Sequence, residues 1–102
     1  HQEIFITTPS FTELVKGAHL SVDPEKGMKK IYELISSFII LNLDKDSAVL
    51  AGKIEADLIN KGEMIEIEDV MIAAICIVNN ESLITRNIKH FEKIPELKVE
   101  RY

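Results

Sequence analysis

The sequence has a single cysteine, no long apolar run and no excess of positive charge. The lone Cys76 excludes an internal disulfide framework and a cysteine-rich zinc site. It lies in the apolar segment Val70–Val78, where a thiol usually behaves as a small buried hydrophobe, and one unpaired cysteine is compatible with a reducing cytosol. That segment is far shorter than the roughly 20 residues that span a bilayer, and the first residues show no signal peptide. We therefore expect a soluble, cytoplasmic protein with no membrane partner.

The charge balance discourages one class of nucleic-acid binder. The 102 residues contain 12 Lys and Arg against 17 Asp and Glu, a formal net charge of −5. A protein that binds nucleic acid through a broad basic face carries the opposite balance. An acidic chain can still act on nucleic acid where a metal ion and a few local cations supply positive charge. The length, the 46% hydrophobic content and the absence of repeats or linkers indicate one domain over residues 1–102.

Short β-branched segments alternate with helical segments along the chain. The predicted strands, of which the second and third are expected to be buried, are Glu3–Thr7, Phe38–Leu43, Ser82–Thr85 and Leu97–Arg101. The predicted helices are one from the capping box Ser10–Glu13 to about Ala18, one from Asp23-Pro24, Asp46–Lys61 with Gly62 as its C-terminal glycine, Val70–Val78, and a turn or short helix at Asn87–Phe91. This alternation predicts an α/β fold with a central, mostly parallel sheet flanked by helices.

Polar side chains follow the predicted strands, where α/β sheets bind ligands. Glu13 comes one short turn after the first strand, Asp69 opens the apolar helix, and Asn87 follows the third strand. If these strands are parallel neighbours, the three side chains project at the same edge of the sheet. Carboxylate and amide oxygens suit Mg²⁺ or Mn²⁺. Such an ion can hold a phosphodiester and lower the pKa of a bound water.

Each of these side chains also has an ordinary structural interpretation. Glu13 can be the capping-box partner of the preceding serine, and Asp69 can be the N-cap of the apolar helix. Asn87 can be a turn residue. His90 is more often a surface or half-buried imidazole than a metal ligand. Spacing alone therefore leaves the active site open.

Three segments resemble the PIN domain, most closely the VapC-type toxin ribonucleases. They are SFTELVKG at 10–17, GEMIEIEDVMIAA at 62–74 and LITRNIKHF at 83–91, and the terminal PELKVERY is similar to the closing strand of these proteins. The resemblance runs over essentially the whole chain. It implies a Mg²⁺-dependent (or Mn²⁺-dependent) endoribonuclease that hydrolyses RNA and is the toxin of a toxin–antitoxin pair. It also implies an antitoxin protein as partner and a homodimer.

The resemblance assigns roles to particular residues. Glu13 and Asp69 match the metal ligands of the family, and Asn87 stands where some members carry a further acid. Thr85 and Asn87 match the polar motif at the exit of the strand, and Arg86 between them is expected to contact phosphate. The implied catalytic residues are therefore Glu13, Asp69 and Asn87, with Thr85 and Arg86 binding the substrate.

The start of the chain departs from the family pattern. PIN domains open with a strand that carries an Asp, whereas this sequence begins at His1 with a segment similar to the second strand. We therefore expect the first strand and helix of the fold, and one metal ligand, to be absent from this sequence. The alternative function is a non-catalytic PIN-like interaction or dimerisation module, or an inactive fragment of the nuclease. A receiver-type phosphoacceptor ranks last, because no pair of Asp residues lies near the first predicted strand.

Overall fold

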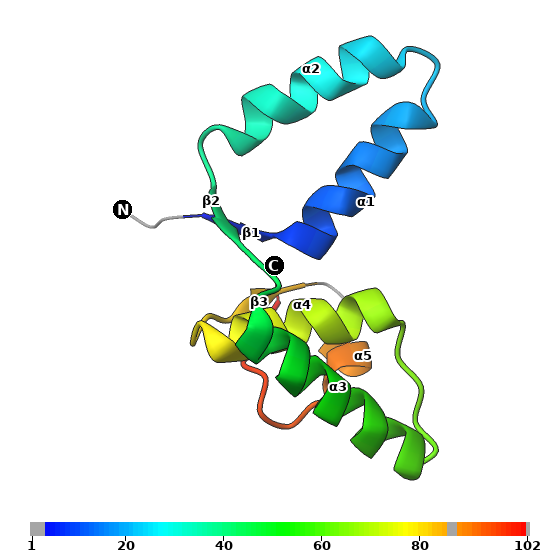
Figure 1. Ribbon diagram of the computed structural model, residues 1–102, viewed down its shortest axis with the longest axis vertical. Coiled ribbons are helices and arrows are strands. Elements are labelled where there is room, and N and C mark those ends of the chain that lie inside the picture. Colours follow the sequence, from blue (N-terminus) through cyan, green and yellow to red (C-terminus); the bar gives the residue numbers. More distant parts are fainter. Residues whose placement is uncertain (1–3, 86–87, 102) are drawn as a thin grey trace. The chain divides into compact units, whose positions relative to one another are not determined.

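The computed structural model describes residues 4–85 and 88–101 (Figure 1). Its elements, in chain order, are β1 (Phe5–Thr7), α1 (Thr8–His19), α2 (Pro24–Ile35), β2 (Ile39–Leu41), α3 (Lys45–Asn60), α4 (Ile67–Val78), β3 (Leu83–Ile84), α5 (Ile88–Phe91) and β4 (Val99–Glu100). No helix in these ranges is both long and apolar enough to cross a membrane. The chain divides into two compact units, a first unit of residues 1–42 and a second unit of residues 43–102. Each is described by itself.

The first unit is a parallel strand pair connected by two helices. Phe5 of β1 lies opposite Ile39 of β2, and the pairing is parallel. Parallel strands need a long crossover, which α1 and α2 provide. The two helices contact each other and lie closest near the turn that connects them (Figure 1). They approach closely at Gly27, where an added Cβ would lie 3.1 Å from the Cβ of Ala18.

The first helix begins earlier than the sequence pattern predicts. α1 starts at Thr8, directly after β1, and its N-cap is Thr7, whose Oγ1 accepts a hydrogen bond from the Ser10 N–H at 3.4 Å. The predicted capping box is therefore wrong, because Ser10 already lies in the first turn. Pro9 is tolerated beside it since an N–H in the first turn has no intrahelical acceptor. Glu13 thus caps nothing; its carboxylate pairs with Lys16.

The predicted burial of two strands is wrong. Ile39 and Ile40 of β2 are each 39% exposed, and Ile84 of β3 is 59% exposed. The described strands form two separate parallel pairs, β1 with β2 and β3 with β4. Each strand therefore has a hydrogen-bonded neighbour on one side only among the described residues, and its side chains are covered less completely than in a wide sheet.

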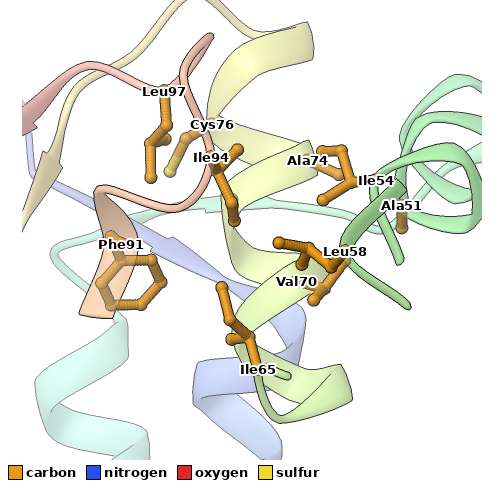
Figure 2. Close-up of a cluster of buried hydrophobic side chains, with 11 residues drawn as sticks. Ala51, Ile54, Leu58, Ile65, Val70, Ala74, Cys76, Phe91, Ile94 and Leu97 are labelled. Carbon is orange, nitrogen blue, oxygen red and sulfur yellow. The ribbon is translucent and has the colours of Figure 1, made fainter. Parts of the chain in front are cut away.

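The second unit is built around α4, as the apolar sequence of this helix predicts. Val70, Ala73 and Ala74 are 0% exposed, and the helix packs closely against α3. Small alanine side chains allow that close approach. Figure 2 shows the core cluster around α4, which also includes Leu58, Ile54 and Ala51 of α3, and Phe91, Ile94 and Leu97 of the C-terminal segment. The parallel pair β3–β4 joins Leu83 to Val99.

Asp44 is the N-cap of α3, and Gly62 follows the other end of the helix as the sequence predicts. The Asp44 carboxylate accepts hydrogen bonds from the Ser47 N–H at 2.9 Å and from the Ser47 hydroxyl at 2.8 Å. These hydrogen bonds, that from the backbone N–H above all, stabilise the ionised form and lower the pKa of Asp44. At the other end Gly62 has a φ of +72°, the left-handed conformation that glycine adopts most readily after a helix.

Candidate functional site

Asp69 lies inside the first turn of α4. The helix begins at Ile67 with Glu66 as its N-cap, and the Glu66 side chain makes no capping hydrogen bond. The Asp69 N–H already donates to the Glu66 carbonyl at 3.0 Å. The interpretation of Asp69 as the N-cap is therefore wrong. Its negative charge is still favourable near the positive end of the helix dipole.

The carboxylate of Asp69 contacts His90. Asp69 Oδ2 lies 3.1 Å from His90 Nε2, and the two side chains are 33% and 24% exposed. The imidazole meets the neighbouring Phe91 ring edge-on, with centroids 5.2 Å apart and planes at 89°. Phe91 is itself buried in the core of the second unit. The sequence predicts a surface or half-buried imidazole at His90, and the side chain is half-buried; its partner could not be predicted, because Asp69 is 21 positions away.

Glu13 lies on an exposed part of α1. Its carboxylate is 3.1 Å from Lys16 Nζ, and the two side chains are 50% and 61% exposed. An ion pair this exposed is screened by water and contributes little to stability. Glu13 belongs to the first unit and Asp69 to the second. A metal site shared by these two carboxylates therefore stays a prediction.

The remaining predicted site residues follow β3. Thr85 is half-buried, and its N–H donates to the Glu100 carbonyl at 2.9 Å, which extends the pairing of β3 with β4. This is the strand exit expected from the sequence. Arg86 and Asn87 lie outside the described residues. Their predicted roles, in phosphate contact and in catalysis, stay predictions.

The donor chemistry of Asp69 fits a hard divalent cation. Among the residues that the structure describes, no three His, Cys, Asp or Glu side chains are grouped so that they could hold a metal. Mg²⁺ does not need such a group, because one or two carboxylates usually bind it while waters and substrate phosphates complete its shell. Asp69 offers oxygen ligands, is one-third exposed to water, and is carried by the most buried helix of the unit. Those properties suit this open mode of binding.

Comparison with known proteins identifies relatives over nearly the whole chain. Residues 1–97 match the PIN domain family. The chain is 32% identical to the tRNA(fMet)-specific endonuclease VapC of Salmonella typhimurium, over 93% of this chain and 72% of that protein. It is 30% identical to the ribonuclease VapC2 of Rickettsia felis, over 97% of this chain and 74% of that protein.

Solved structures show the same fold. VapBC2 from Rickettsia felis, bound to a DNA fragment from its promoter, matches with a TM-score of 0.91 and 30% identity, over 98% of this chain and 75% of that chain. VapBC-1 from nontypeable Haemophilus influenzae matches with a TM-score of 0.92 and 27% identity, over 97% and 74%. The predicted α/β, PIN-like fold is confirmed.

Proposed function

The chain belongs to the PIN domain family, and we propose that it is a metal-dependent endoribonuclease, the toxin of a toxin–antitoxin pair. The observation that carries the proposal is the position of Asp69, the predicted metal ligand. Its carboxylate stands one-third exposed on the first turn of the most buried helix. The names of the relatives, which are VapC ribonucleases and endonucleases, support the nuclease class.

In the proposed chemistry, a divalent cation supplies the positive charge and the protein side chains hold it in place. Asp69 and Glu13 are the proposed ligands of Mg²⁺ or Mn²⁺. When bound, such an ion offsets phosphodiester charge and lowers the pKa of a coordinated water. The contribution of the chain is to keep the Asp69 carboxylate in place, which the buried Val70 and Ala73 on the same helix do by packing in the core. Thr85 and Arg86 are the proposed contacts to the RNA backbone.

The proposed partners follow from the family. The solved relatives include VapBC structures from Rickettsia felis, Salmonella typhimurium and Haemophilus influenzae. They support an antitoxin protein as a partner of this chain. We also propose an RNA substrate, a homodimer and a cytoplasmic location. A pull-down with a co-expressed candidate antitoxin tests the protein partner, and sedimentation equilibrium tests the homodimer.

RNA cleavage by the full-length protein that carries this chain tests the nuclease. We expect cleavage with Mg²⁺ or Mn²⁺ that EDTA abolishes. Asp69→Asn should reduce the rate by at least about 100-fold, since even residues outside the first shell of a metal contribute about 10–100-fold. Glu68→Gln is the matched control, because it removes the same charge from the same helical turn at an exposed position. Glu13→Gln tests the second ligand, with the exposed Glu25→Gln as its control.

Two outcomes would contradict this proposal. If Asp69→Asn cleaves RNA as fast as the unsubstituted protein, the assignment of Asp69 is wrong. If the full-length protein cleaves no RNA with either cation, the non-catalytic interaction module becomes the better description.

A further inference from the structure

We propose that His90 is a positioning residue for the Asp69 carboxylate: its Nε2–H donates a hydrogen bond to Asp69 Oδ2 and thereby fixes the direction of that carboxylate toward the cation. The inference rests on the proposed function, because it concerns the same metal ligand. It assigns a role to a side chain that the spacing of the sequence leaves without one.

The geometry supports a directed contact between these two side chains. The separation of 3.1 Å between Nε2 and Oδ2 is hydrogen-bond distance. A carboxylate only accepts, so the imidazole has to carry its proton on Nε2 to complete the bond. Both side chains are partly buried, which limits competition from water. The interaction therefore selects one imidazole tautomer and engages one named oxygen of Asp69.

The segment that carries His90 is fixed by the core. Phe91 is 6% exposed, and Ile94 beyond it is 2% exposed. Both belong to the cluster that also contains Val70, one residue after Asp69. The edge-on contact with the Phe91 ring further restricts the imidazole. A donor on a restrained ring orients its acceptor more strongly than a mobile surface side chain would, which is what a positioning role requires.

Two amide substitutions at His90 distinguish a hydrogen-bond donor at the Nε2 position from a side chain that only fills space. A glutamine places its amide nitrogen about where the Nε2 of histidine lies, whereas the shorter asparagine places it near the Nδ1 position. His90→Gln should therefore keep the hydrogen bond to Asp69, and His90→Asn should lose it. Both substitutions replace an imidazole by a neutral amide, so a purely structural role would respond to them similarly. His90→Ala removes the donor altogether.

The first measurement needs neither metal nor activity. In long-range ¹H–¹⁵N spectra at alkaline pH, where imidazoles are neutral, we expect His90 to be held in the Nε2–H form. His19, which is exposed on α1, serves as an internal reference for an unrestrained tautomer mixture. Asp69→Ala should shift His90 toward that mixture. A predominant Nδ1–H form, or a tautomer ratio that Asp69→Ala leaves unchanged, would overturn the proposal.

The second measurement is Mn²⁺ affinity, followed by electron paramagnetic resonance of the free ion. His90→Ala and His90→Asn should weaken binding about 10-fold or more, and His90→Gln should stay within about threefold of the unsubstituted protein. Equal weakening by Gln and Asn, or no weakening by Ala, would overturn the positioning role while leaving the metal site intact. If the unsubstituted protein binds Mn²⁺ no better than Asp69→Asn, the proposed metal site itself fails and this inference fails with it.

Discussion

Removing the Leu58 side chain should open the core of the second unit and expose Cys76 to thiol reagents. Leu58 lies on α3, is 3% exposed, and belongs to the same buried cluster as Cys76. Its neighbour Ile59 is 56% exposed on the same helix. Leu58→Ala and Ile59→Ala therefore remove similar side chains from adjacent positions that differ in burial.

The expected cost follows from the buried groups that are lost. Leu58→Ala removes three carbon atoms from the core, each with a transfer free energy of about 0.8 kcal/mol. The cavity that remains adds to this transfer free energy, so the free energy of unfolding should fall by about 2–5 kcal/mol. If the free energy of unfolding falls by about 3 kcal/mol, the population of open molecules rises on the order of 100-fold. Ile59→Ala should change that population by less than about threefold, because alanine also forms helix more readily than isoleucine.

Cys76 reports this opening directly. The residue is 5% exposed, and burial, with a smaller contribution from the charge of Glu81, raises the pKa of its thiol from the ordinary 9.0 to about 11. Below pH 9 the buried thiol is protonated and inaccessible, so labelling by a maleimide or disulfide reagent requires opening. When opening is fast relative to labelling, the labelling rate follows the open population.

The raised pKa of Cys76 also predicts how the stability of the fold changes with pH. Between pH 9 and pH 11 the unfolded chain releases the thiol proton while the native state retains it, so stability should fall as pH rises through this range. The assay is therefore run just below it. If Leu58→Ala and Ile59→Ala label at the same rate, or if neither differs from the unsubstituted protein, the packing of α3 on α4 through Leu58 is wrong.

Two further predictions concern the ends of α3. Asp44→Ala should lower the urea midpoint of unfolding at neutral pH. Hydrogen bonds from Ser47 lower the pKa of the Asp44 carboxylate in the folded state, so the difference in midpoint should shrink below pH 3.8 as this carboxylate becomes protonated. A difference that stays constant with pH would contradict the cap. Gly62→Ala should destabilise by about 1–2 kcal/mol because its φ is +72°, while Gly52→Ala, within α3 and with open space for a Cβ, should stabilise by about 0.5–1 kcal/mol. Thermal unfolding of both variants measures the contrast, and equal shifts would refute it.

Local sequence rules predicted the elements whose signals have no competitor. Asp23 precedes α2 and caps it, since its carboxylate accepts the Lys26 N–H, and Gly62 follows α3 in the left-handed conformation. The apolar composition of α4 predicted its central place in the core. The rule failed where two caps competed. Thr7 and Ser10 can both begin a helix, and the chain uses Thr7 because α1 follows β1 without an intervening turn.

The site shows a different limit of sequence reasoning. Local pattern predicts an acidic side chain at the start of α4, and Asp69 lies in the first turn of that helix. Its contact with His90 depends on where the core places α5, which in turn depends on the burial of Phe91 and Ile94. No short-range pattern contains that information, because helix and strand signals act over a few residues and this contact spans 21 positions.

The failed capping interpretations bear on function. With Thr7 as the N-cap of α1 and Glu66 as the N-cap of α4, neither Glu13 nor Asp69 is needed to begin its helix. Glu13 keeps an exposed ion pair that contributes little to stability, and Asp69 keeps a dipole interaction of about 0.3–1 kcal/mol and its hydrogen bond with His90, which contributes about 0.5–1.5 kcal/mol. Neither structural contribution is large. A substitution that abolishes RNA cleavage at either position while changing stability this little would therefore have removed chemistry rather than structure, and that separation is the decisive test of the proposed nuclease.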